Sequence, residues 1–220
     1  MDTDASKSRL EAIRTSYDRV ATAFTEAIFN ELDKKPFDRE LLRRFALATS
    51  GRGAMVEIGC GPGQVSRFLR DHGATVSGID LSSAMVEQAE RLNPDIQFRV
   101  GDMTALDLPD GSVAAIVAFY AIVNLTGALR QRAFSEMARV LAPGGELLLS
   151  FHVGDEVLDP KEMWGKPVEM SFYMLDPAKI RNELQSVGLS VKELIEREPY
   201  APEVEHQTRR AYLWARKTED

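Results

Sequence analysis

The sequence predicts an α/β fold in which a mainly parallel sheet is covered by helices on both faces. Three observations support this. Short apolar segments alternate with segments whose apolar residues recur every three or four positions, which is typical of strands alternating with helices. Residues 113–119 are almost continuously apolar, as in a strand buried on both faces. The last two apolar segments have only a loop between them, so that pair should be antiparallel.

The individual elements follow from periodicity and from the residues that end each segment. Apolar residues at helical spacing mark the first helix, Ser82 is a plausible N-cap, and Pro143-Gly144-Gly145 and Gly188 end two later helices. The expected helices are residues 8–31, a short segment after Pro36, 64–72, 82–92, 129–141 and 178–187. The expected strands are residues 54–58, 75–79, 96–100, 113–119, 146–151, 191–196 and 209–215.

Length and composition favour one globular domain. The chain has 220 residues, of which 44% are hydrophobic and 28% charged. We expect a single domain with a helical cap (1–50), a cofactor-binding core (51–152) and a substrate-side lid with the final strands (153–220). The only cysteine, Cys60, excludes an intramolecular disulfide and a cysteine-rich zinc site.

Charge and hydropathy point away from nucleic acid and membranes as partners. The formal net charge is −7, whereas nucleic-acid binding usually needs a basic face. No apolar segment has the length of a membrane span, and the N-terminus lacks a positive-then-apolar pattern. We therefore expect a cytoplasmic protein, either a monomer or a homodimer, with a small-molecule substrate. The three histidines have no close ligand spacing, so no metal site is expected.

A glycine-rich turn follows the first strand. In EIGCGPG, Gly59 and Gly61 let the backbone pass close to a ligand, and Gly63 eases packing at the helix entry. A tight turn without a ligand is the alternative. In the dinucleotide fingerprint the third glycine would fall at position 64, one place later than Gly63. Glu57, at the end of the strand, would repel a pyrophosphate but could bind an ammonium group.

Acidic residues also end the next two strands. Asp80, 21 residues after Gly59, can accept hydrogen bonds from both hydroxyls of a ribose, or it can cap the following helix. Asp102 could accept a hydrogen bond from an adenine amino group, and Met103 could pack on the ring. Since parallel strands end at one edge of the sheet, these carboxylates should converge with Glu57.

At these residues the sequence resembles the class I S-adenosylmethionine-dependent methyltransferases. EIGCGPG is similar to their glycine motif, GID to their ribose-binding motif, GD to their adenine-site motif and RVLAPGGELLLS to the helix-turn-strand that follows. The resemblance implies a doubly wound, Rossmann-like seven-stranded sheet of order 3-2-1-4-5-7-6 with strand 7 antiparallel. It also implies S-adenosylmethionine as the cofactor and S-adenosylhomocysteine as its product.

The N-terminal SYDRVATAF is similar to the helix that covers the methionine portion of the cofactor in many small-molecule methyltransferases, with Tyr17 facing it; a core position for Tyr17 is equally consistent. Cys60 is expected to be an inert residue behind the turn. The residues expected at the cofactor are Tyr17, Glu57, Gly59, Cys60, Gly61, Gly63, Asp80, Leu81, Met85, Asp102, Met103 and Phe119.

The sequence says less about the methyl acceptor. Methyl transfer depends mainly on positioning the two reactants and excluding water, so it does not require a fixed set of catalytic residues. The chain has AFYAIVNL after the fourth strand, where many nucleic-acid and protein N-methyltransferases carry Asn/Asp-Pro-Pro-aromatic. His152 is the best candidate for a general base because an imidazole titrates near neutrality, and Tyr120 is a second catalytic candidate. Arg209 or Arg210 would suit a carboxylate, although a solvated charge cluster is the alternative for each. The residues expected at the substrate are Asn124, Trp164, Phe172, Tyr173, Tyr200 and Arg209.

The leading hypothesis is therefore an enzyme that transfers a methyl group from S-adenosylmethionine to an O, N or C nucleophile of a small molecule. Two alternatives remain open. The chain could act on the aminobutyl chain of the same cofactor, as a lyase or cyclase. It could also be an NAD-dependent oxidoreductase, against which the early third glycine and Glu57 count.

Overall fold

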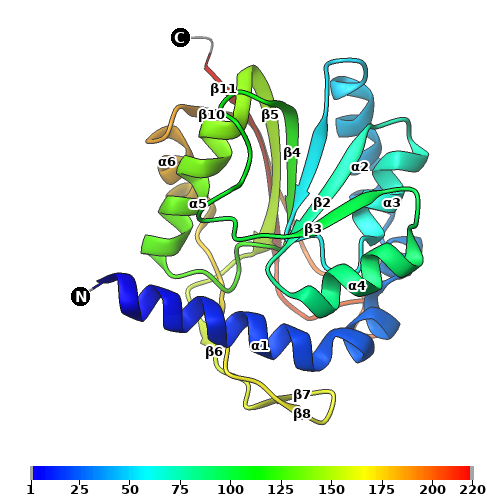
Figure 1. Ribbon diagram of the computed structural model, residues 1–220, viewed down its shortest axis with the longest axis vertical. Coiled ribbons are helices and arrows are strands. Elements are labelled where there is room, and N and C mark those ends of the chain that lie inside the picture. Colours follow the sequence, from blue (N-terminus) through cyan, green and yellow to red (C-terminus); the bar gives the residue numbers. More distant parts are fainter. Residues whose placement is uncertain (1, 219–220) are drawn as a thin grey trace.

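Seven strands form one sheet in the computed structural model, which describes residues 2–218 (Figure 1). The strands are β1 (Met55–Ile58), β2 (Val76–Asp80), β3 (Gln97–Val100), β4 (Val113–Phe119), β5 (Leu141–His152), β10 (Leu189–Arg197) and β11 (Arg210–Lys217). Their order is β10-β11-β5-β4-β1-β2-β3. Strands β1 to β5 pair with one another in parallel, and β11 is antiparallel to both β5 and β10. The predicted order and the predicted reversed strand are confirmed.

Six α-helices and one 3-10 helix are described in residues 2–218. They are α1 (Asp2–Ile28), η1 (Glu31–Lys34), α2 (Pro36–Thr49), α3 (Gln64–Asp71), α4 (Ser83–Leu92), α5 (Gly127–Val140) and α6 (Pro177–Gln185). The predicted cap is present, since the Ser82 hydroxyl accepts the backbone N–H of Met85 at the start of α4. All the helices expected from the sequence are found, with ends that differ by up to six residues, the largest difference being at the start of α1.

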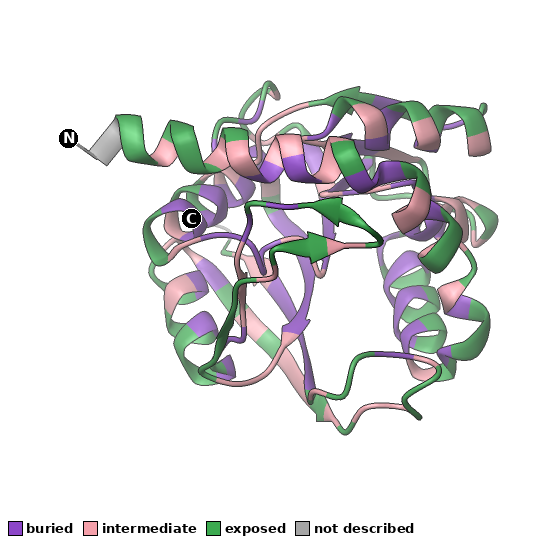
Figure 2. Ribbon diagram, turned by 90° about the horizontal axis from the view of Figure 1, so that it is seen from below, coloured by how far each residue is buried: buried purple, intermediate pink, exposed green. Residues whose placement is uncertain are grey.

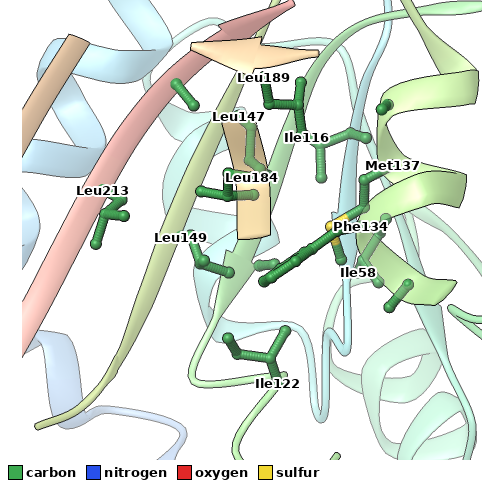
Figure 3. Close-up of a cluster of buried hydrophobic side chains, with 14 of the residues drawn as sticks. Ile58, Ile116, Ile122, Phe134, Met137, Leu147, Leu149, Leu184, Leu189 and Leu213 are labelled. Carbon is green, nitrogen blue, oxygen red and sulfur yellow. The ribbon is translucent and has the colours of Figure 1, made fainter. Parts of the chain in front are cut away.

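The core has two layers because successive residues of a strand point to opposite faces of the sheet. On β4, Ile116 and Ala118 face α5 and α6, whereas Ala115, Val117 and Phe119 face α2 and α3. Figure 3 shows Phe134 and Met137 of α5 directed at Ile58 and Ile116 of the sheet. The alternation explains why β4 is apolar along nearly its whole length.

Helix α1 lies across the carboxyl ends of the parallel strands, next to the segment that follows β5 (Figure 1). Figure 2, viewed from below, shows buried and exposed residues alternating along α1. The segment after β5, in which no strand was expected, contains two short antiparallel pairs. These are β6 (Val157–Leu158) with β9 (Phe172–Tyr173), and β7 (Glu162–Met163) with β8 (Lys166–Pro167).

Among the described residues, no helix combines the length and the apolar character that crossing a membrane requires.

Candidate active site

A cavity of about 460 Å³ lies where the parallel strands end, between their loops and helix α1. The position agrees with the general rule for open parallel sheets, in which ligands bind beyond the carboxyl ends of the strands. Most of the residues predicted at the cofactor or the substrate line it. They are Tyr17, Glu57, Gly59, Cys60, Gly61, Asp80, Leu81, Met85, Asp102, Met103, Phe119, Tyr120, Asn124, His152, Trp164 and Phe172.

The glycine turn and Asp80 are held together by the backbone. Asp80 Oδ2 accepts the N–H of Gly61 at 2.8 Å, and Oδ1 accepts the N–H of Ser82 at 2.9 Å. Gly59 has a φ of +70°, and a Cβ there would lie 2.5 Å from the Cβ of Ala121. The turn therefore needs glycine at position 59 both for its backbone conformation and for its close packing. Cys60 is buried behind the turn against Phe98 and Val86, in agreement with its expected place.

Glu57 is a buried carboxyl group in the pocket wall with 2% of its surface exposed. The Ser66 hydroxyl donates a hydrogen bond to its Oε2. Burial raises the pKa of Glu57 to about 8, against the opposing effect of the Ser66 hydrogen bond. No cationic side chain of the described residues contributes to this shift. A cationic ligand group would therefore find an acceptor without a competing cation.

Helix α1 closes the pocket through polar contacts to three other segments. The Tyr17 hydroxyl donates to Asn124 Oδ1 at 2.8 Å, and Asn124 Nδ2 donates to the carbonyl of Ser171 at 2.7 Å. Asp18, the next residue of α1, accepts the Ser82 hydroxyl with its Oδ1 at 2.6 Å. These bonds join α1 to the loop after β4, to the segment after β5 and to the start of α4. Asp18 was not identified from the sequence, where it looks like one of many acidic residues on a solvated helix face.

Tyr120 follows β4 in a conformation that is rare for residues other than glycine, with a φ of +55°. Its N–H donates to the carbonyl and the hydroxyl of Ser150, and its hydroxyl lies 3.2 Å from that of Tyr212. The ring of His152 lies 5.1 Å from the ring of Tyr120. The strained backbone thus directs Tyr120 toward His152 inside the pocket.

His152 differs from the expectation that it titrates near neutrality. Burial, followed by the neighbouring charges of Arg210, His206 and Lys35, lowers its pKa to about 3. Its Nδ1 lies 2.7 Å from the Thr208 hydroxyl. The imidazole is therefore neutral at pH 7 and a weaker base than an exposed histidine, because burial and the neighbouring cations both oppose its protonation.

This shift predicts a loss of stability in acid. The unfolded chain binds a proton at position 152 below about pH 6.5, whereas the folded chain does not until about pH 3. Lowering the pH from 7 to 5 should therefore reduce the free energy of unfolding by about 2 kcal/mol through this residue. Urea unfolding of the wild type and of His152→Gln at both pH values measures the difference. His72→Gln, outside the pocket at the end of α3, is the control, and equal acid sensitivity in wild type and His152→Gln would contradict the assignment.

Four predicted site residues do not line the pocket. Gly63 packs against Asn93 and Phe98 at the start of α3. The Tyr173 hydroxyl accepts a hydrogen bond from Arg9, and the Tyr200 hydroxyl accepts the N–H of Phe37.

Arg209, the fourth, is exposed and pairs with Glu196. It is the next residue, Arg210, that lines the cavity, because neighbouring residues at the start of β11 point to opposite faces.

Several other lining residues, among them Phe24, Ile28, Glu31, Lys35 and Gln64, were not identified from the sequence. Periodicity along α1 could have placed Phe24 and Ile28 beside Tyr17. The sequence did not indicate that Glu31, Lys35 and Gln64 line the pocket, because their position depends on how α1 and α2 pack against α3. No group of three or more His, Cys, Asp or Glu side chains that could hold a metal ion is found within the described part of the chain.

The chain is similar to known methyltransferases. Residues 55–145 match the family model of a methyltransferase domain. Phosphatidylethanolamine N-methyltransferase of Cereibacter sphaeroides is 33% identical over 150 residues, which are 65% of this chain and 69% of that protein. Demethylmenaquinone methyltransferase of Beutenbergia cavernae is 35% identical over 96 residues, 44% of this chain and 39% of the relative, so the matched part is well under half of that protein.

Among solved structures, a DhpI–SAH complex superposes with a TM-score of 0.74 over 96% of this chain and 98% of the other, at 19% identity. At that identity the likeness concerns the fold, and it extends to α1 and to the last two strands, beyond the segment that the family model matches.

Proposed function

Since the chain belongs to the class I S-adenosylmethionine-dependent methyltransferases, we propose that it transfers a methyl group from this cofactor to an oxygen, nitrogen or carbon nucleophile of a small molecule. The observation that carries the proposal is the convergence of Glu57, the glycine turn and Asp80 on one cavity. The cavity volume lies within the roughly 300–1,000 Å³ typical of small-molecule sites. Two relatives are named for small-molecule acceptors, demethylmenaquinone and phosphatidylethanolamine.

The residues present fit S-adenosylmethionine. Its ammonium group needs hydrogen-bond acceptors, and the pocket wall offers the buried carboxyl of Glu57 and the amide oxygen of Gln64, which is buried without a partner. The two backbone bonds to Asp80 fix a carboxylate that has lone pairs left for two ribose hydroxyls. Asp102 Oδ1 accepts the N–H of Thr104 at 2.7 Å, which orients this side chain next to Met103.

When bound, S-adenosylmethionine supplies a methyl group on a positively charged sulfur. The chain's own residues then have three tasks in our proposal. Gly59 and Gly61 let the backbone approach the ligand, the Tyr17–Asn124 bond holds α1 over the pocket and excludes water, and Tyr120 and His152 orient the acceptor. A neutral imidazole with a lowered pKa is better suited to accept a hydrogen bond than to remove a proton, so the acceptor should be a nucleophile that needs little help from a base.

The proposal predicts that cofactor binding releases a proton. The Glu57 carboxyl, with its pKa of about 8, is mainly protonated at pH 7, and an ammonium group beside it favours the ionised form. Affinity for S-adenosylhomocysteine should therefore rise as the pH increases from 6 to 8. Calorimetric titrations at pH 7, in two buffers with different ionisation enthalpies, measure the released proton. Glu57→Gln should bind more weakly and release none; release that is unchanged in Glu57→Gln would exclude Glu57 as its source.

Product analysis tests the reaction itself. The protein is incubated with S-adenosylmethionine and pools of metabolites, and the products are identified by mass spectrometry. We expect S-adenosylhomocysteine together with an acceptor that is heavier by one methyl group. Methylthioadenosine as the main product would instead indicate attack on the aminobutyl chain and would refute methyl transfer.

A further inference from the structure

Two cationic side chains and two imidazole rings gather around one part of the cavity, beside the ring of Tyr120. We call Lys35, His152, His206 and Arg210 the basic end of the pocket; all four line it. Lys35 Nζ and Arg210 Cζ each lie 5.9 Å from the centre of the Tyr120 ring. The His152 and His206 rings are 6.2 Å apart. These groups come from three segments of the chain, around positions 35, 152 and 206–210, so their convergence is a result of folding.

Two carboxylates near the basic end, Glu205 and Asp38, make their short ion pairs with Arg197. Both oxygens of Glu205 accept hydrogen bonds from Arg197, and Oε1 also accepts the N–H of Tyr200. The Asp38 carboxylate accepts hydrogen bonds from the Arg197 guanidinium and from the Tyr212 hydroxyl. Little acceptor capacity therefore remains for the cations that face the cavity.

Arg210, at the basic end of the pocket, has a hydrogen-bond donor that no protein atom accepts. Its side chain is 2% exposed, and its Nε is buried with no hydrogen-bond partner. Its terminal nitrogens donate to the Thr208 and His206 carbonyls, with a longer contact of 3.6 Å to Glu205. A buried donor without a partner destabilises the fold, and more so when it is charged. An acceptor atom supplied by a ligand would remove this destabilisation.

Lys35 also has spare donor capacity. Its ammonium group donates to Glu31 at 2.6 Å and lies 3.7 Å from Glu205, which leaves at least one of its three protons for the cavity. After burial, the largest cause, Arg210, His206 and Lys35 lower the pKa of His152, whereas Glu205 opposes them.

We propose that the basic end of the pocket binds a carboxylate of the methyl acceptor, so that the acceptor is an organic acid. This inference rests on the proposed methyl transfer and names its substrate class. A singly charged group fits better than a phosphate dianion, because Glu31 and Glu205 in the same wall would repel the second charge. The aromatic residues elsewhere in the wall, among them Phe24, Phe119 and Trp164, suit an apolar body attached to the acid.

Three matched probes test the proposal: phenylacetate, phenylacetamide and phenyl phosphate. Their affinities are measured by calorimetry with and without saturating S-adenosylhomocysteine. The wild type should bind phenylacetate at least about tenfold more tightly than the amide, since a charge-assisted hydrogen bond contributes about 1.5–3 kcal/mol. Arg210→Met should remove most of this preference. Lys35→Met is the second variant in case Arg210→Met does not fold, and Arg44→Met, an exposed residue paired with Glu193, is the control.

The outcomes separate this inference from the proposed function. Loss of the acid preference in Arg210→Met and Lys35→Met, but not in Arg44→Met, would support the inference. Equal binding of acid and amide by the wild type would overturn it, as would tighter binding of phenyl phosphate than of phenylacetate. A wild type that prefers the acid but fails to bind S-adenosylhomocysteine would count against the proposed function alone.

Discussion

Asp80→Ala should weaken the binding of S-adenosylhomocysteine by about a hundredfold or more. The wild-type carboxylate accepts the N–H groups of Gly61 and Ser82 and, in our proposal, both ribose hydroxyls. Alanine removes the ligand contacts and also the bond that holds the glycine turn against β2. Two charge-assisted hydrogen bonds to the ligand, at about 1.5–3 kcal/mol each, correspond to a loss of this size. Calorimetric titration of the variant measures it.

Two further variants identify the cause of that loss. Asp80→Asn keeps the size of the side chain and one acceptor oxygen, so its affinity should fall between those of the wild type and Asp80→Ala. Asp107→Ala, an exposed carboxylate outside the pocket, should bind as the wild type does. Asp80→Ala with wild-type affinity would exclude Asp80 from the cofactor site.

Gly59→Ala should lower the free energy of unfolding by about 2–4 kcal/mol and impair cofactor binding. A φ of +70° costs a residue with a Cβ about 1 kcal/mol, and the new Cβ would lie 2.5 Å from that of Ala121. Because Gly59 and Ala121 both line the pocket, the displacement needed to relieve this contact changes the cofactor site. Urea unfolding and calorimetric titration of the variant measure the two effects.

Gly51→Ala is the matched control. Gly51 has a φ of +72°, but an added Cβ would have nothing within 4 Å. This variant should lose only about 1 kcal/mol of stability and should bind the cofactor normally. If both variants lost the same stability, crowding against Ala121 would make no contribution at position 59.

Most of the sheet could be predicted from the sequence because its strands are short apolar runs between helices. The reversed strand followed from the absence of a helix between residues 197 and 208. The start of β5 could not be predicted. Pro143-Gly144-Gly145 has the composition of a chain break, yet backbone pairing begins at Leu141, with an irregular register between Val113 and Ala115 on β4.

The part of the site that could be predicted is the part attached directly to strand ends. Glu57, Asp80 and Asp102 are placed by the sheet itself, so their spacing along the chain was sufficient to predict that they converge. Arg209 and Arg210 point to opposite faces of strand β11. Choosing between them required the exact register of this strand, because a shift of one residue exchanges the two faces. Lys35 lies between η1 and α2, where tertiary packing decides its position.

The central claim is that the cavity binds S-adenosylmethionine, and a competition titration tests it most directly. S-adenosylhomocysteine is titrated into the protein by calorimetry, alone and in the presence of excess NAD. The account predicts one site per chain, with an affinity that NAD does not change. No binding of S-adenosylhomocysteine at millimolar concentration, or its displacement by NAD, would contradict the account.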